Sequence, residues 1–281
     1  MMETQQIDLF SHDGLKMFAV RDLAADPVGT VVISHGLGEH CGRYETFAGE
    51  LTDGGYHVYR FDHRGHGKSE GERAYAASFS HYIEDLSLVI RRAKTDFPDL
   101  PCFLFGHSMG GGIAAAYGIK TDGEVEGIIL SGAATHTPKM AKGPMRPLIR
   151  TLGKLAPHIA LGNSLGKLVS KDPKVVEGYL NDSLNCPKIT MGLYNAFLVR
   201  GIDEIMVRAG EFCYPVLILH GGSDKIVQPA ASEHFYEKCA SADKTLKIYP
   251  GVYHEIFNEP ERGEAVGDVL AWLSLHNRSS G

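Results

Sequence analysis

The chain has 281 residues, of which 43% are hydrophobic and 22% are charged, values that are ordinary for a globular enzyme. Its formal net charge of −6 argues against a nucleic-acid partner, which would require a basic surface over the domain. The chain opens without a basic and apolar leader, and no window approaches about 18 uninterrupted apolar residues, so we expect a cytoplasmic protein without a membrane span.

Hydrophobic periodicity predicts strands and helices that alternate along most of the chain. An antiparallel hairpin comes first, with strands at 6–10 and 15–20 around a His-Asp-Gly turn. Further strands are expected at 30–34, 57–61, 102–105, 125–130, 216–219 and 245–249. Helices are expected at 44–54, 79–97, 110–120, 230–240 and 263–276. This alternation indicates an α/β fold with a mainly parallel sheet covered by helices on both faces.

The strand at 30–34 ends in the turn His35-Gly36-Leu37-Gly38. The two glycines let the backbone approach a bound molecule closely, and such a turn after an early strand supplies one N–H group to an oxyanion hole. Leu37 is therefore a candidate oxyanion donor. The alternative is that this turn does no more than end the strand.

The pentapeptide GHSMG at 106–110 follows an apolar strand and precedes a run of glycine and alanine at helical spacing. In a strand, turn and helix of this kind, the glycines relieve crowding, so that the serine hydroxyl stands clear of the sheet. Ser108 is therefore the candidate nucleophile of an acyl transfer. The backbone N–H of Met109 is the second candidate oxyanion donor.

A second pentapeptide with the same spacing, GNSLG at 162–166, is a decoy. We expect no strand before it, and it lies among lysines and leucines at helical spacing. Ser164 is therefore predicted to be a loop or helix-end residue and not a nucleophile.

The alternation of strands and helices stops between about 135 and 209. Within this stretch, residues 139–174 contain six Lys and two Arg against the single acid Asp172, for a net of +7. Because the whole chain carries −6, the remainder carries −13. The stretch therefore reads as a basic insertion in an acidic domain.

Apolar residues recur at helical spacing over 145–156, beside a stripe of Arg146, Arg150 and Lys154. The same pattern is repeated by Leu161, Leu165, Leu168 and Val169. Basic amphipathic helices fit a lid that meets an anionic lipid surface and lines an acyl groove. The alternative is a solvated helix face that balances the acidic remainder of the chain.

A serine nucleophile needs a histidine to take its proton and a carboxylate to orient the imidazole. Asp224 follows one late strand and His254 lies in the loop after the next, which places both at the sheet edge where Ser108 lies. The other histidines beyond Asp224 are His234, inside a helical pattern, and His276, near the polar end of the chain. We therefore expect His254 to be the base and Asp224 its partner.

Five cysteines without CxxC spacing predict reduced thiols and no disulfide framework. Fourteen histidines raise the question of a metal, above all His63 with His66 and His35 with His40. Neither pair has i, i+4 helical spacing with a glutamate base, and no acidic cluster completes a ligand set. We expect no metal and no cofactor.

Several longer motifs accompany the pentapeptide: HGLGEH at 35–40 with GRY at 42–44, FDHRGHGKSEG at 61–71, and KTLKIY at 244–249 leading to YH at 253–254. Together they resemble the monoacylglycerol lipase and lysophospholipase branch of the serine α/β-hydrolases. The resemblance implies an eight-stranded, mainly parallel sheet flanked by helices, with an inserted helical lid. It also implies metal-independent ester hydrolysis by Ser108, Asp224 and His254, with Leu37 and Met109 as oxyanion donors.

In that branch the Glu of HGxGEH and the Arg of GRY organise the polar end of the site. The resemblance therefore implies Glu39 and Arg43 as substrate-binding residues; the alternative is a buried ion pair that braces the oxyanion loop. Tyr179 resembles a lid tyrosine near the glycerol head group. His63 and His66 are expected to shape a tight loop without taking part in catalysis.

The sequence thus predicts an α/β-hydrolase core in two parts, 1–134 and 210–281, with a helical cap inserted at 135–209. We expect a serine ester hydrolase that cleaves monoacylglycerols, or similar single-chain lipids such as lysophospholipids, through an acyl-enzyme. The expected partner is a small lipid or ester, with peripheral membrane contact through the cap. The alternatives are a carboxylesterase of short-chain or feruloyl-type esters, a peptidase or thioesterase, and a non-catalytic binding module on a hydrolase scaffold.

Overall fold

An eight-stranded sheet forms the centre of the computed structural model, which describes residues 3–138 and 141–277. The strand order is β1-β2-β4-β3-β5-β6-β9-β10. Strands β1 and β2 pair antiparallel, as do β2 and β4, and the other neighbours pair parallel. The strands are β1 (Glu3–Phe10), β2 (Lys16–Leu23), β3 (Gly29–Ser34), β4 (Tyr56–Phe61), β5 (Cys102–His107), β6 (Gly127–Ser131), β9 (Val216–Gly221) and β10 (Lys244–Tyr249).

The central strands are buried along their whole length. Every residue of β3, β4, β5, β6 and β9 is buried, which explains why these segments read as nearly continuous apolar runs in the sequence. The edge strand β10 is only partly buried, and polar side chains alternate with apolar ones along part of it. The α/β fold with a mainly parallel sheet is therefore confirmed.

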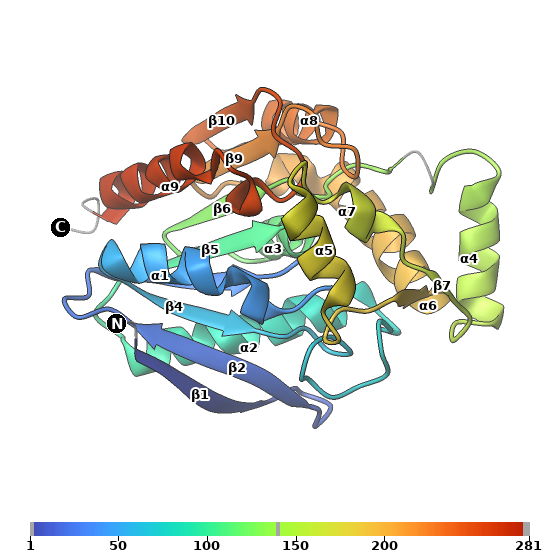
Figure 1. The fold of residues 1–281 in the computed structure, drawn as a ribbon, viewed down its shortest axis with the longest axis horizontal. Coiled ribbons are helices and arrows are strands. Elements are labelled where there is room, and N and C mark those ends of the chain that lie inside the picture. Colours follow the sequence, from blue (N-terminus) through green and yellow to red (C-terminus); the bar gives the residue numbers. More distant parts are fainter. Residues whose placement is uncertain (1–2, 139–140, 278–281) are drawn as a thin grey trace.

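Helices cover both faces of this sheet (Figure 1). One face is covered by α1 (Glu45–Asp53) and α9 (Arg262–Asn277). The other is covered by α2 (Phe79–Asp96), α3 (Met109–Lys120) and α8 (Ala230–Lys238). Because each helix follows a parallel strand, the loops that leave the carboxyl ends of those strands gather at one edge of the sheet.

The residues between β6 and β9 leave the sheet and form what we call the inserted segment. Figure 1 shows its elements gathered where the parallel strands end. They are α4 (Met145–Leu155), β7 (Ala160–Gly162), a 3-10 turn (Leu165–Leu168), α5 (Pro173–Asn181), β8 (Lys188–Thr190), α6 (Met191–Tyr194), a π-helix (Asn195–Gly201), α7 (Ile202–Arg208) and a second 3-10 turn (Ala209–Glu211).

The helical pattern expected at Leu161, Leu165, Leu168 and Val169 is wrong. Residues 160–162 instead form β7, which pairs antiparallel with β8, and only one 3-10 turn follows. The side-chain oxygen of Asn163 accepts a hydrogen bond from the backbone N–H of Leu165 at 3.1 Å. Because such a local bond offers the backbone an alternative to helix, the apolar spacing alone was misleading here.

Backbone hydrogen bonds tie the inserted segment to the loops of the core. The N–H of Cys186 donates to the carbonyl of Gly38 at 2.8 Å, and the N–H of Glu255 donates to the carbonyl of Val169 at 2.8 Å. These bonds place the inserted segment directly over the turn at 35–38 and the loop after β10. Among the helices in the described part of the chain, none is long and apolar enough to cross a bilayer.

Candidate active site

Ser108 lies at the apex of the turn between β5 and α3. Its backbone has φ 54° and ψ −116°, and Ala74 is the one other non-glycine residue with positive φ in the ranges 3–138 and 141–277. A residue held in such a conformation stores roughly 1–3 kcal/mol of strain, which persists only where the surroundings enforce it. Bonds to neighbouring loops do so, because the N–H of Ser108 donates to Ser131 and its carbonyl accepts from Ala134.

Glycine is required on both sides of this serine. A Cβ atom at Gly106 would lie 2.4 Å from the carbonyl oxygen of Gly110, and one at Gly110 would lie 2.1 Å from that of Ser34. Both obstacles are backbone atoms that cannot move aside. The pentapeptide therefore has its glycines because α3 begins in direct contact with β3 and β5.

Ser164 has none of these features. A short strand, β7, does precede it, so the expectation that no strand would do so is wrong. Its backbone, however, is unstrained at φ −93° and ψ 0°, and its side chain is exposed at the start of a 3-10 turn. The structure therefore separates the two pentapeptides by their backbone geometry.

His254 and Asp224 lie in the loops after β10 and β9, as the strand order predicts. Nδ1–H of His254 donates to Oδ2 of Asp224 at 2.6 Å, and both residues are buried. The other oxygen of Asp224 accepts from the backbone N–H groups of Ile226 and Val227 at 2.8 and 3.0 Å. With the carboxylate fixed by the backbone, Nε2 of His254 is left free to accept a proton.

Ser108 and His254 line the same small cavity, which we call the Ser108 cavity; its other walls include Leu37, Glu39, Tyr179 and Glu255. Among the described residues the Ser108 hydroxyl makes no hydrogen bond to His254. Bonds between a catalytic nucleophile and its base are often long without substrate and tighten in the complex. The arrangement can therefore support proton transfer from Ser108 once a substrate is bound.

The electrostatic surroundings suit His254 as a base. Burial opposes its charged form, but the Asp224 carboxylate, with Glu255 and Glu39 nearby, outweighs burial and raises the pKa of His254. Burial likewise opposes the charge of Asp224, but its contacts with His254 and His220 hold the pKa of Asp224 well below its usual range. The pair therefore keeps a negative carboxylate ready to stabilise an imidazolium.

Sequence reasoning missed His220, which also contacts Asp224. His220 is completely buried, and its Nε2 lies 3.2 Å from Oδ2 of Asp224 and 2.9 Å from the carbonyl of Val227. Its Nδ1 lies 2.7 Å from the hydroxyl of Ser232. The sequence does carry a signal, because His220 interrupts an apolar strand four residues before Asp224, although the chain order of nucleophile, acid and histidine directs attention to histidines after Asp224.

The turn at 35–38 is braced by Glu39. Oε1 of Glu39 accepts from the N–H of Gly36 at 2.6 Å and from the hydroxyl of Tyr44 at 2.7 Å. Within the described part of the chain, the N–H groups of Leu37 and Met109 have no acceptor. Met109 is the first residue of α3, where an unpaired N–H is expected. Both groups are thus available to an oxyanion near Ser108.

The three residues expected at the polar end lie together. Nε of Arg43 lies 3.6 Å from Oε2 of Glu39, and its guanidinium stacks on the ring of Tyr179 at 4.5 Å. Glu39 and Tyr179 line the Ser108 cavity, whereas Arg43 lines a neighbouring cavity of about 10 Å³. For Arg43, a bracing ion pair therefore fits the geometry better than direct contact with substrate.

Glu255, which immediately follows His254, is a second residue that sequence reasoning missed. Its Oε2 accepts from Nη2 of Arg43 at 2.6 Å and from Nδ2 of Asn258 at 2.9 Å. Burial raises the pKa of Glu255. Arg43 favours the charged carboxylate and opposes this rise, whereas the negative charge of nearby Glu39 adds to it. Burial alone would raise the pKa of Glu39 as well. Its interactions with Arg43, His107 and His35 outweigh burial and bring the pKa of Glu39 down to about 2. The guanidinium of Arg43 thus pairs with two buried carboxyl groups, those of Glu39 and Glu255.

Two cavities of different character meet at Ser108. The Ser108 cavity has a volume of about 20 Å³, room for about one water molecule. The other, which we call the apolar cavity, has about 380 Å³ and extends beneath the inserted segment. Its apolar walls include Leu165, Tyr194, Phe197 and Leu198. A larger hollow of about 580 Å³ lies outside α5 and contains no residue of the candidate site.

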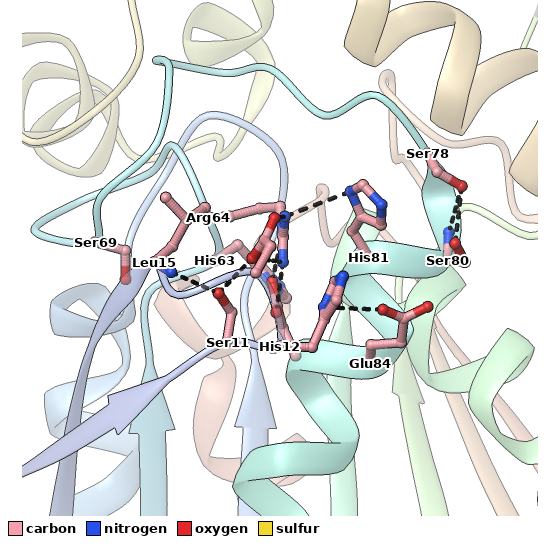
Figure 2. Close-up of polar contacts among 12 residues, drawn as sticks. Ser11, His12, Leu15, His63, Arg64, Ser69, Ser78, Ser80, His81 and Glu84 are labelled. Carbon is pink, nitrogen blue, oxygen red and sulfur yellow. Dashed lines mark hydrogen bonds and ion pairs between the residues drawn. The ribbon is translucent and has the colours of Figure 1, made fainter.

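The motif at 61–71 builds a rigid loop away from the reacting groups. Asp62 accepts from the N–H groups of Cys41 and Lys68 at 2.8 and 2.7 Å. Arg64 donates to both oxygens of Asp85 at 2.6 and 2.8 Å. Figure 2 shows Arg64 reaching toward His81, and His12 of the first hairpin toward Glu84 of α2.

The histidines of this motif are buried in the loop. Nε2 of His63 lies 3.1 Å from the hydroxyl of Ser34, and Nδ1 of His66 lies 3.0 Å from the carbonyl of Arg64. Burial lowers the pKa of His66 to about 3, so its ring stays neutral. These contacts agree with a role in shaping the loop. Among the residues that the structure describes, no group of three or more potential ligands is arranged to hold a metal ion.

Comparison with known proteins places most of the chain among hydrolases. The family model described as serine aminopeptidase, S33, matches residues 25–261. The chain is 39% identical over 252 residues to a monoacylglycerol lipase of Mycolicibacterium smegmatis, covering 89% of this chain and 90% of that one. It is 33% identical over 254 residues to a phospholipase of Bacillus subtilis, covering 89% and 96%.

A solved structure is similar over nearly all of the chain. It is a soluble variant of monoglyceride lipase from Saccharomyces cerevisiae in complex with a substrate analog. The TM-score is 0.86 with 28% sequence identity, covering 98% of this chain and 96% of that one. The chain therefore shares the fold of this lipase over nearly its whole length.

Proposed function

The chain belongs to the serine aminopeptidase S33 family and is a serine ester hydrolase, and from this we propose that it cleaves monoacylglycerols to a fatty acid and glycerol. The observation that carries the proposal is that two cavities meet at Ser108: the apolar cavity of about 380 Å³ and the small, more polar Ser108 cavity. An acyl chain fits the first, and a hydroxylated alcohol fits the polar surroundings of the second.

We propose a two-step acyl transfer. Nε2 of His254 takes the proton of the Ser108 hydroxyl as its oxygen attacks the ester carbonyl. The N–H groups of Leu37 and Met109 donate to the oxyanion that forms, and Asp224 stabilises the imidazolium of His254. The carbon–oxygen bond to the alcohol then breaks, and the alcohol leaves with the proton from His254. Water repeats the sequence on the acyl-enzyme and releases the fatty acid.

The test is a matched panel of esters, with the Ser108→Ala variant as blank. It comprises 1-monoacylglycerols of graded chain length, a lysophosphatidylcholine, a triacylglycerol, and short aryl and feruloyl esters. Each buried methylene is worth about 0.8 kcal/mol, so kcat/KM should rise up to about fourfold per methylene until the apolar cavity is full. A preference for short aryl or feruloyl esters would refute the proposal and leave the triad in place.

That alternative, a carboxylesterase of short-chain esters, has one observation in its favour. The Ser108 cavity has about 20 Å³, which is too small for a glyceryl group without movement of α5 and Tyr179. A small alcohol would need less movement. The dependence of kcat/KM on acyl length and on the alcohol therefore separates the two functions.

We further propose that residues 135–209 act as a cap that contacts anionic membranes. What supports this is the apolar surface of α4, where Met145 and Leu148 are each 47% exposed and Leu155 is 80% exposed. The cations Arg150 and Lys154 are exposed on the same helix. An amphipathic helix of this kind gains binding energy both from apolar burial and from anionic head groups.

The double variant Arg150→Gln with Lys154→Gln, which removes both charges, should bind vesicles of anionic lipid at low salt more weakly by roughly tenfold or more. The reason is that each cation near an anionic leaflet adds about 1 kcal/mol. Flotation of vesicles measures this binding. The matched control neutralises Arg91 and Lys238, which are exposed on α2 and α8. Equal binding by both double variants, or no binding by the unaltered protein, would refute membrane contact through the cap.

A further inference from the structure

Among the described residues, the walls of the Ser108 cavity contain acidic side chains but no lysine or arginine. The acidic side chains are those of Glu39 and Glu255. The nearest guanidinium, that of Arg43, is bonded to Glu255, lies 3.6 Å from Glu39 and lies outside the lining. With both carboxyls ionised this cluster has a net charge of −1, and with Glu255 protonated it is neutral. In neither state does it offer a free cation.

This cavity is the one that must receive the alcohol half of an ester. In the proposed mechanism His254 protonates the leaving oxygen, so the alcohol lies on the side of His254. His254 lines the Ser108 cavity and is not part of the apolar cavity. Once α5 and Tyr179 move to admit it, the group attached to the leaving oxygen will lie against Glu255 and Glu39.

Glu255 is the carboxyl with a free oxygen. Both oxygens of Glu39 are engaged, one by Gly36 and Tyr44 and the other by Arg43. The two bonds that Glu255 accepts go to its Oε2, and among the described residues its Oε1 accepts none. Glu255 can therefore take a hydrogen bond from a substrate hydroxyl without losing its existing partners, whereas Glu39 holds the oxyanion turn.

We infer that Glu255 determines the specificity for the alcohol half, favouring an uncharged, hydroxylated alcohol and rejecting one that carries a phosphate. This inference rests on the proposed function and adds the choice between a glyceryl and a phosphoglyceryl lipid. A phosphate monoester is mostly a dianion at neutral pH, so it is a poor donor to Glu255, and it brings further negative charge into a site of low dielectric. A glycerol hydroxyl donates to the same oxygen at no electrostatic cost.

The test compares four octanoyl esters below their critical micelle concentrations: the 1-monoacylglycerol, the matching lysophosphatidic acid, its neutral dimethyl phosphate ester, and ethyl octanoate. The unaltered protein should cleave the monoacylglycerol and the dimethyl phosphate ester and discriminate against the charged lysophosphatidic acid. The dimethyl ester is larger than the acid but uncharged, so this comparison separates charge from size. Rejection of both phosphate compounds would overturn the inference without any variant.

Glu255→Gln should lower the ratio of kcat/KM for monoacylglycerol to that for lysophosphatidic acid by roughly tenfold or more, mainly through faster cleavage of the acid. Glu255→Asp should retain the discrimination. Glu261→Gln removes the same charge from an exposed side chain outside the Ser108 cavity and should leave the ratio unchanged. Ethyl octanoate, which has neither hydroxyl nor phosphate, reports in each variant whether the triad still works.

The outcomes distinguish this inference from the proposed function. An unchanged ratio in Glu255→Gln, with ethyl octanoate still cleaved, overturns the role of Glu255 alone. Cleavage of ethyl octanoate but of none of the three glycerol lipids by the unaltered protein overturns the proposed function and this inference with it. Should Glu255→Gln fail to fold, the phosphate compounds in the unaltered protein still test the inference, because equal cleavage of lysophosphatidic acid and its dimethyl ester would overturn it.

Discussion

Replacing Ser108 by alanine is expected to lower kcat for any ester by about a million-fold while the protein stays folded. The proposed mechanism has no other group that could form the acyl-enzyme, so what remains is binding and the oxyanion donors. The Ser108 side chain is small and lines a cavity, and its loss leaves the bonds of its backbone in place. Steady-state hydrolysis of a monoacylglycerol and thermal unfolding of the same sample measure both parts of the prediction.

Two variants serve as controls for Ser108→Ala. Ser164→Ala, at the decoy pentapeptide, should keep full activity because Ser164 is exposed and outside both cavities at Ser108. Ser108→Gly should be as inactive as Ser108→Ala but unfold at a higher temperature, since glycine adopts positive φ without strain. Near-normal hydrolysis by Ser108→Ala would remove the whole mechanism.

Replacing Asp224 by asparagine should lower kcat by about ten-thousandfold. An asparagine amide can donate a hydrogen bond to Nδ1 of His254, which would place the proton on Nε2 and so block the base. The variant also loses the charge that stabilises the imidazolium. The measurement is kcat against pH for the variant and the unaltered protein, with active sites counted by a covalent serine probe.

The pH profile adds a second readout for Asp224. Only neutral His254 can accept the serine proton, so activity rises with pH through the raised pKa of His254, above its ordinary value near 6.5. In Asp224→Asn the carboxylate no longer opposes the effect of burial on His254. The pKa of His254 should therefore fall, and the rise in activity should move to lower pH. Asp243→Asn is the matched control, because Asp243 contacts His276 at 2.9 Å outside the site. An unshifted profile in Asp224→Asn would contradict the pairing of Asp224 with His254.

The elements of the core were predictable because their signals are local. Parallel strands buried on both faces appear as apolar runs, and the predicted strand at 102–105 corresponds to β5 at Cys102–His107. The turn at Ser108 was predictable for a similar reason, since Gly106 and Gly110 are required by contacts within five residues and with one neighbouring strand. The order of Asp224 and His254 followed from parallel strands that end at one edge.

The inserted segment was harder to predict. The helix expected over 145–156 is present as α4, but the residues that follow pair as β7 with β8, some thirty residues further along the chain. Such pairing depends on tertiary contacts that periodicity does not report. Leu161 lies on the exposed strand β7 and Leu165 begins a 3-10 turn, so the two do not share one helix face.

The polar residues of the site were predictable only where they lie in a motif. Glu39 and Arg43 came from the resemblance, and the structure adds that Arg43 also pairs with Glu255, more than two hundred residues away. His220 interrupts an apolar strand and Glu255 directly follows His254, but neither position in the sequence shows which groups the side chain contacts. Their positions follow from the packing of the loops after β9 and β10.

The central claim is that Ser108, activated by His254, forms a covalent intermediate with esters. Labelling with a fluorophosphonate, followed by mass spectrometry of the digested protein, tests it most directly. We expect one probe per chain, attached to Ser108, with labelling lost in Ser108→Ala and slowed in Asp224→Asn. Attachment at Ser164, or an unlabelled protein that still hydrolyses monoacylglycerol, would contradict it.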